Sequence, residues 1–252
     1  MSNTTTDRAS TGGCFVVFEG VEGAGKSTHV RRVAERLDRC GIAYLLVREP
    51  GGTEVGERAR QLVLDPRFEM GPEAELFLYL AARAEFVRRL ARPALERGEL
   101  VLADRYQLST FAYQGRGRGL DLDLVRQVNR IATGGLEPDL TLLLTVDPEV
   151  GRSRQRGRPD RIEGERADFH RVVADAYDEF AAANDRTIRI VADGPHDVVH
   201  ERIWNELSTR WPERFPAASA RAGNISAPGE FHECEPPARG GSDIESTGQE
   251  AE

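Results

Sequence analysis

A short apolar stretch followed by a glycine-rich turn constrains the fold of this chain more than any other feature. Residues 14–19, Cys-Phe-Val-Val-Phe-Glu, have the pattern of a β-strand buried on both faces, as in parallel sheets. Gly-Val-Glu-Gly-Ala-Gly-Lys-Ser follows at residues 20–27, and the pattern over 26–39 predicts an amphipathic helix. A strand, a G-x-x-x-x-G-K-S loop and a helix in this order predict a loop that wraps around phosphate groups.

Each residue type in this loop has a physical role. The glycines let backbone N–H groups turn toward phosphate oxygens, and the positive end of the helix adds to their attraction. Lys26 can reach the β- and γ-phosphates, and the Ser27 hydroxyl can ligate Mg²⁺. We therefore expect a nucleoside triphosphate to bind at Gly20, Val21, Glu22, Gly23, Ala24, Gly25, Lys26, Ser27 and Thr28.

The lysine content supports this interpretation. Of 34 basic residues, Lys26 is the only lysine. Coding bias in a GC-rich genome explains an excess of arginine, but it does not explain why the single lysine lies in this loop. A forked guanidinium would not fit a loop wrapped closely around a phosphate.

The rest of the chain alternates between strand and helix patterns. We expect strands at 42–47, 100–103, 140–146 and 188–191, and helices at 54–64, 72–97, 108–114, 121–132, 148–155, 165–184 and 198–210. This alternation predicts an α/β fold, a three-layer sandwich with a mostly parallel five-stranded sheet. The G-x-x-x-x-G-K-S loop makes a fold of the P-loop NTPase type the expectation. Ligands should bind outside the carboxyl ends of its strands.

Composition sets the expected domain organisation. The chain has 252 residues and a net charge of −8, and its length suits one large domain at 14–215. Residues 1–13 are polar, and residues 216–252 hold seven acidic residues against two arginines, so we expect both segments to be disordered. No apolar run suits a membrane helix or a signal peptide. We expect a cytoplasmic protein that binds neither nucleic acid nor membranes.

The third predicted strand is followed by Asp104-Arg105-Tyr106. An acid beside the phosphates suits a Mg²⁺-linked role, and the adjacent arginine suits a second anion; alternatively, Asp104 only caps a helix. A guanine-specific switch would need an Asn-Lys-x-Asp motif, which a chain whose only lysine is Lys26 cannot supply. A motor ATPase would have paired acids here. A kinase with a small acceptor fits better.

Five arginines lie within residues 152–161 and, with Gly157 and Pro159, indicate a mobile lid over about 152–164. Such a cluster repels itself unless an anion or solvent relieves it, and a transferring γ-phosphoryl group is one such anion. The alternative is a solvated basic loop in an arginine-rich protein.

Several motifs now occur in a recognisable order: residues 18–28, Arg48-Glu-Pro-Gly-Gly-Thr53, Asp104-Arg-Tyr106 with Ser109-Thr-Phe-Ala-Tyr-Gln114, and Asp160-Arg-Ile-Glu163. In this order they resemble the bacterial thymidylate kinase family over about residues 14–210. The resemblance implies transfer of a phosphoryl group from ATP to dTMP, giving ADP and dTDP for dTTP biosynthesis. It also implies a nucleoside monophosphate kinase fold, a homodimer, and Mg²⁺ held by Ser27 and Asp104.

The resemblance also implies roles for individual residues. The ring of Tyr79 would stack on thymine, with Phe77 as the alternative, and Arg83, one helical turn later, would grip the 5′-phosphate. Tyr113 would crowd a ribose 2′-hydroxyl. The implied dTMP-binding residues are Glu22, Glu49, Arg60, Tyr79, Arg83, Arg105, Thr110, Tyr113 and Gln114, and the implied catalytic residues are Lys26, Asp104, Arg154, Arg156 and Arg158.

Two other functions remain open at this point. One is a related kinase that acts on another small acceptor, such as a deoxynucleoside. The other is a regulatory nucleotide-binding protein that transfers no phosphate.

Overall fold

A computed structural model describes residues 12–154, 157–216 and 230–231 of the chain. Its strands are β1 (Cys14–Glu19), β2 (Tyr44–Arg48), β3 (Leu100–Asp104), β4 (Leu140–Thr145), β5 (Thr187–Val191) and β6 (Glu230–Phe231). Its α-helices are α1 (Lys26–Arg39), α2 (Glu54–Leu64), α3 (Pro72–Phe86), α4 (Arg92–Glu96), α5 (Gln107–Thr110), α6 (Leu122–Thr133), α7 (Pro148–Arg154), α8 (Ala167–Ala182) and α9 (His196–Arg210). Two π-helical segments, η2 (Val87–Ala91) and η3 (Phe111–Gly117), continue α3 and α5.

The strands form one parallel sheet in the order β5-β4-β1-β3-β2-β6. Its register places the functional ends of three strands together, because Asp104 at the end of β3 lies opposite Phe18 of β1 and Arg48 of β2. The predicted phosphate loop leaves β1 at this same edge. The carboxyl edge of the sheet is therefore where the predicted site residues converge.

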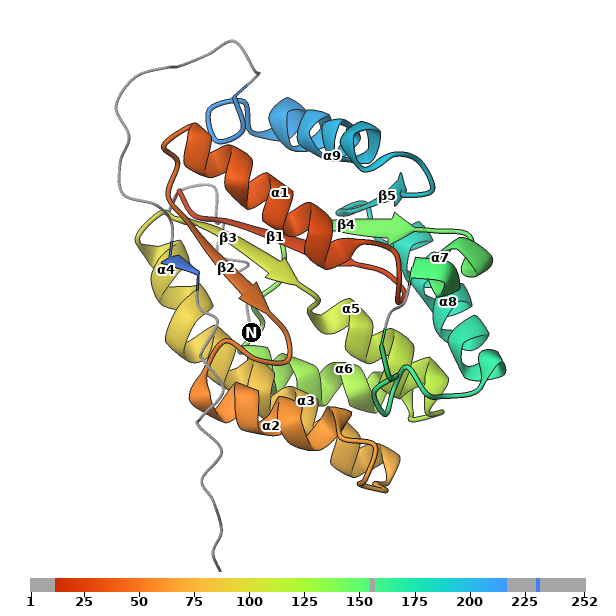
Figure 1. The fold of residues 1–252 in the computed structure, drawn as a ribbon. Coiled ribbons are helices and arrows are strands. Elements are labelled where there is room, and N and C mark those ends of the chain that lie inside the picture. The colour runs from red at the N-terminus through yellow and green to blue at the C-terminus, as the bar shows by residue number, and fades with distance from the viewer. Residues whose placement is uncertain (1–11, 155–156, 217–229, 232–252) are drawn as a thin grey trace, which may run out of the picture.

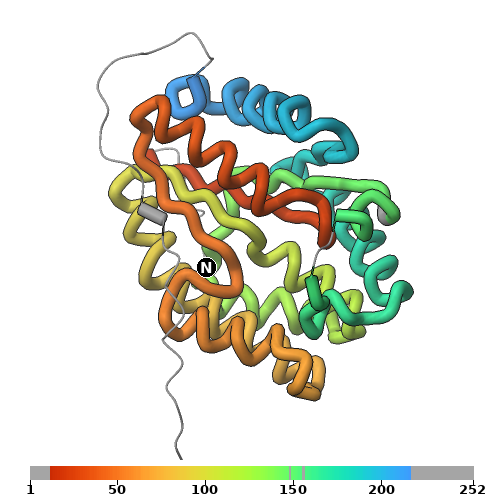
Figure 2. Tube along the Cα trace, viewed as in Figure 1, coloured from red at the N-terminus to blue at the C-terminus, as the bar shows by residue number. Residues whose placement is uncertain are grey.

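Helices cover both faces of the sheet (Figure 1). Alternate residues of a strand point to opposite faces, so Val16 and Phe18 pack in one core with α1 and α9, while Phe15 and Val17 pack in another with η2 and α4. Figure 2 shows that α1 and α9, from opposite ends of the described chain, lie side by side on one face. The predicted three-layer α/β fold is confirmed.

Three features differ from the sequence prediction. The helix expected over 108–114 is α-helical only as far as Thr110 and continues as the π-helix η3 to Gly117. The helix expected over 72–97 is helical throughout 72–96, but its middle turn widens to a π-helix at η2. The prediction of five strands also omitted β6, which lies within residues 216–252, the segment predicted to be disordered, and pairs with β2. Most of that segment, and most of 1–13, lies outside the described residues. Within the described part of the chain, no helix combines the length and apolarity that a membrane crossing requires.

Candidate active site

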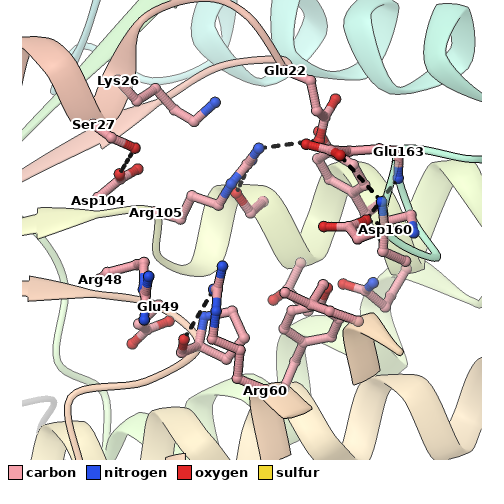
Figure 3. A pocket seen from close by; sticks show the side chains of 18 of the residues that line it. Glu22, Lys26, Ser27, Arg48, Glu49, Arg60, Asp104, Arg105, Asp160 and Glu163 are labelled. Atoms are coloured by element: carbon pink, nitrogen blue, oxygen red, sulfur yellow. Dashed lines mark hydrogen bonds and ion pairs between the residues drawn. The ribbon is translucent and has the colours of Figure 1, made fainter. Parts of the chain in front are cut away.

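A cavity of about 260 Å³ opens at the carboxyl edge of the sheet. Its wall combines the phosphate loop, the ends of β2 and β3, and residues of α2, α3, α5 and η3, and Figure 3 shows its charged side chains facing one another. The predicted site residues that line it are Glu22, Gly23, Gly25, Lys26, Ser27, Glu49, Arg60, Tyr79, Asp104, Arg105, Thr110, Tyr113 and Gln114. A second cavity of about 160 Å³ adjoins it and shares Ser27, Arg48, Arg60 and Asp104.

The phosphate loop has the backbone that its glycines allow. Gly25 precedes α1 in the left-handed region at φ 86°, and no described side chain caps the helix there. The first-turn N–H groups of α1 are therefore left for an anionic ligand. Gly23 also has a positive φ of 75°, and a Cβ atom at this position would lie 2.1 Å from the carbonyl oxygen of Gly151 in α7. The loop and α7 can approach this closely only because position 23 is a glycine.

Lys26 lies on the wall of the cavity with 7% of its surface exposed, and its Nζ donates a hydrogen bond to the carbonyl oxygen of Val21 at 2.7 Å. Burial and the nearby charge of Arg105 lower the pKa of Lys26 to about 8, against the opposing influence of Asp104 and Glu22. A buried ammonium with this lowered pKa has more to gain from an incoming polyphosphate than an exposed lysine would have.

Ser27 and Asp104 meet across the cavity wall. The Ser27 hydroxyl donates a hydrogen bond to Oδ2 of Asp104, so a residue from α1 and a residue from the end of β3 present oxygen atoms to the same point. A hydroxyl and one carboxylate are oxygen ligands of the type that Mg²⁺ uses in nucleotide sites, where substrate phosphates and water complete the coordination. Among the described residues, no group of three or more His, Cys, Asp or Glu side chains is arranged to hold a metal ion.

Arg105 has an unusual backbone, because its φ of 76° lies in the left-handed region. Its guanidinium donates to Glu22 Oε1 at 3.1 Å, and the Tyr113 hydroxyl donates to the same oxygen at 2.5 Å. Burial raises the pKa of Glu22, but the charges of Arg105 and Lys26 outweigh this and leave it below its ordinary value. Glu22 is therefore a carboxylate that holds two groups of the cavity wall in place.

Arg83 does not line the cavity but lies directly behind its wall. Its side chain is almost fully buried and donates to Glu49 Oε2 at 2.8 Å, to the Thr110 hydroxyl at 2.8 Å and to Asn129 Oδ1 at 2.9 Å. Burial raises the pKa of Glu49 to about 7, although the charge of Arg83 acts in the opposite direction. Glu49 Oε1 has no hydrogen-bond partner in the described structure. The role of Arg83 as a direct phosphate ligand stays a prediction.

The two candidate stacking residues are separated by the fold. Tyr79 lines the cavity, whereas 59% of the surface of Phe77 is exposed and Phe77 takes no part in the wall. Arg60 lines the same wall and donates to the carbonyl oxygen of Pro50 at 3.2 Å. The position of Tyr79 therefore supports the first of the two predicted stackers.

The lid arginines have different surroundings. Arg154, at the end of α7, donates to the carbonyl oxygens of Gly23 at 3.4 Å and Ala192 at 3.0 Å, which places it against the phosphate loop. Arg158 is exposed to solvent. Arg156 lies outside the described residues. Farther along the lid, Asp160 and Glu163 line the cavity (Figure 3).

Sequence reasoning missed several residues that build this site. Two buried carboxylates brace it from behind: Glu19 accepts hydrogen bonds from the Tyr106 N–H and the Ser109 hydroxyl, and Glu75 accepts from Gln114. The wall also includes Arg48, Asp160 and Glu163, which belong to the motifs but had no assigned role. The available signal was an acidic residue at a position where the strand or helix pattern requires burial, as at Glu19 in an otherwise apolar strand.

A phosphate loop, a carboxylate beside it and an arginine-lined second half of the same cavity, at the carboxyl edge of a parallel sheet, define a P-loop nucleotide kinase. Comparisons with known proteins narrow this class. The family model described as thymidylate kinase matches residues 18–203. The chain is 48% identical over 201 residues to a thymidylate kinase of Deinococcus radiodurans, which covers 79% of this chain and 98% of the relative.

Two further similarities agree. A thymidylate kinase of Halothermothrix orenii is 44% identical over 200 residues, covering 77% of this chain and 96% of the relative. The crystal structure of a thymidylate kinase from Ehrlichia chaffeensis superposes with a TM-score of 0.65 at 28% identity, covering 78% of this chain and 99% of that one. The chain belongs to the thymidylate kinase family.

Proposed function

We propose that this protein transfers the γ-phosphoryl group of ATP to dTMP, forming ADP and dTDP for dTTP synthesis. The observation that carries the proposal is that one cavity joins the phosphate loop to an arginine-lined second half. We assign Lys26 and Ser27, in the phosphate loop, to the donor side, and Arg60 and Arg105, which line the same cavity, to the acceptor side. Membership of the thymidylate kinase family agrees with this assignment. We also propose a cytoplasmic location, in keeping with membership of this family.

The reaction needs positioning and charge neutralisation more than proton transfer. The acceptor oxygen belongs to an anionic phosphate, so no strong general base is required, and the protein must hold two highly charged groups close together. Lys26 and the loop N–H groups would hold the donor phosphates. Arg60 and Arg105 would neutralise the acceptor phosphate, and Tyr79 would stack on its base. Closure over the site would keep water from the γ-phosphate.

The oxygen atoms at Ser27 and Asp104 fit Mg²⁺, and these two residues would hold it. When bound, the ion supplies positive charge beside the donor phosphates. Arg154 is the lid arginine that the structure places against the phosphate loop, so we propose it as the lid cation closest to the donor. Arg158 is exposed and does not line the cavity, so it would reach the site only after the lid moves.

An ADP-release assay with ATP and Mg²⁺ tests the function against a panel of acceptors. We expect turnover with dTMP, slower turnover with other nucleoside monophosphates, and loss of turnover when EDTA removes Mg²⁺. Turnover with deoxythymidine but not dTMP would instead indicate a deoxynucleoside kinase. Nucleotide binding without ADP release for any acceptor would indicate a regulatory protein.

We also propose that the protein forms a homodimer through α3 and α6. Leu124 and Ile131, seven residues apart on the same face of α6, have exposed fractions of 52% and 75%, and Phe77 on the neighbouring α3 is also exposed. Ile131→Glu should convert the dimer to a monomer in light scattering after size-exclusion chromatography. The matched control is Val198→Glu on α9, an exposed apolar residue away from this face; dissociation by both variants, or by neither, would contradict the proposed interface.

A further inference from the structure

Behind the acceptor side of the cavity, one carboxylate holds three side chains. Glu75 of α3 is 1% exposed, and its oxygens accept hydrogen bonds from Gln114 Nε2 at 2.7 Å, from Arg118 Nη2 at 2.9 Å and from Arg161 Nη2 at 2.6 Å. Arg161 belongs to the lid and also donates to the carbonyl oxygen of Val63. Of these partners, only Gln114 lines the cavity, so Glu75 is connected to the acceptor site through the Gln114 amide.

The ionisation of Glu75 decides how that amide is oriented. Burial raises the pKa of Glu75, but the hydrogen bonds from Arg118, Gln114 and Arg161 outweigh burial and leave it below its ordinary value. An ionised carboxylate can only accept hydrogen bonds, so the NH₂ group of Gln114 must face it. The carbonyl Oε1 of Gln114 is then the end of the amide left over, and no described residue donates a hydrogen bond to it. Gln114 therefore offers the cavity an acceptor.

We propose that Glu75 is a positioning residue for base selection: by holding the Gln114 amide in one orientation, it makes this wall of the acceptor site select bases with a ring N–H. The inference rests on the proposed function. Thymine and uracil carry a hydrogen on ring nitrogen N3, which can donate to Gln114 Oε1. Cytosine has a lone pair on N3, which would face that oxygen without a hydrogen bond. A fixed amide therefore selects thymine and uracil over cytosine.

The test measures dissociation constants of dTMP, dUMP and dCMP by calorimetry for the full chain and for Glu75→Gln. A glutamine at position 75 can either donate or accept, so the Gln114 amide is free to turn. We expect the dTMP preference over dCMP to fall on the order of 10-fold, the size associated with one buried hydrogen bond. The preference for dTMP over dUMP should stay within about twofold, because both bases carry the N3 hydrogen.

Arg118→Gln is the matched control. It removes another hydrogen-bonded partner of Glu75 and leaves Gln114 in place. Its ratio of the dCMP to the dTMP dissociation constant should stay within about twofold of the ratio for the unaltered protein, even if both affinities fall. In a Gln114→Leu background, Glu75→Gln should produce no further change in the ratio. Equal losses of dTMP and dCMP in Glu75→Gln, or a ratio that still changes without Gln114, would overturn the proposal.

Two outcomes separate this inference from the proposed function. If the unaltered protein binds dTMP no better than dCMP and releases no ADP with dTMP, the proposed function itself fails. If it prefers dTMP but Glu75→Gln retains the full preference, only the inference fails. Should Glu75→Gln not fold, as judged by circular dichroism, Glu75→Asp decides: it keeps the charge but shortens the reach to Gln114, so its ratio must fall, and an unchanged ratio overturns the inference.

Discussion

The guanidinium of Arg83 and the carboxylate of Glu49 meet at 2.8 Å with side-chain exposures of only 2% and 3%. Arg83 also donates to Thr110 of α5 and to Asn129 of α6, so one cation ties these two helices to the end of β2. Pairs buried to this degree are costly to break, because the remaining charge has no solvent to stabilise it. The arrangement explains how a residue behind the cavity can control the shape of its wall.

Removing the Arg83 cation should therefore affect both stability and acceptor binding. Arg83→Met leaves Glu49 buried without a partner and should lower the free energy of unfolding by about 3–5 kcal/mol in urea titrations. The KM for dTMP should rise at least about 10-fold more than the KM for ATP, because Thr110 and Glu49 lose their support on the acceptor side. Arg116→Met, which breaks an exposed pair with Glu179, is the control and should cost less than about 1 kcal/mol. Equal effects on the two KM values would contradict an acceptor-side role.

We expect Lys26 to lower the stability of the nucleotide-free protein and yet to be essential for turnover. Its pKa is about 8 in the folded protein and about 10.5 for a free lysine, because burial disfavours the charged form. At pH 7 the ammonium is therefore still charged, and keeping it buried costs stability. Lys26→Met should raise the free energy of unfolding by roughly 1–3 kcal/mol without nucleotide and lower kcat at least about 100-fold. A variant that is less active but no more stable would argue against a costly buried charge.

The backbone at Arg105 offers a test of stored strain. At φ 76°, a glycine adopts the required conformation without the penalty that a Cβ atom imposes. The free energy of unfolding of Arg105→Gly should therefore be about 1 kcal/mol higher than that of Arg105→Ala, although both variants lose the hydrogen bond to Glu22. The same two variants should be similarly impaired in dTMP turnover. A more stable alanine variant would mean that the backbone at this position relaxes after substitution.

Stability should decrease in mild acid because of a buried histidine. His29 in α1 is 1% exposed, and burial together with nearby His196 and His200 lowers its pKa to about 4. In the unfolded chain its pKa is about 6.5, so between these values the unfolded state binds the extra proton and folding loses stability as the pH falls. His29→Leu should reduce the drop in melting temperature between pH 7 and pH 4.5. An identical drop in both proteins would assign acid sensitivity to other groups.

Local chemistry made half of this site predictable. The phosphate-binding residues predicted between β1 and α1 are consecutive in the sequence, so Lys26, Ser27 and the glycines could be predicted from the motif alone. All of them except Gly20 line the cavity. The order of strands and helices followed from patterns of apolar residues. The site on the carboxyl edge of the sheet then followed from the topology of parallel sheets.

The arginine-lined half of the cavity was harder to predict because its contacts are distant in sequence. Glu75 meets Gln114 and Arg161 from 39 and 86 residues away, and no local pattern indicates such a meeting. Helical spacing correctly placed Tyr79 and Arg83 on one face, but it could not show that Arg83 points behind the wall toward Glu49. Val87 and Ala91 of η2 pack in the core against the sheet, and no local pattern predicted the π-helical turn there.

The contact between Gly23 and Gly151 leaves no room for a side chain at position 23. The two backbones are so close that a methyl group on Gly23 would overlap the carbonyl group of Gly151. α7 therefore packs on the phosphate loop without an intervening side chain. Arg154, one helical turn after Gly151, donates a hydrogen bond to the carbonyl oxygen of Gly23. A side chain at position 23 would therefore have to push α7 away from the phosphate loop.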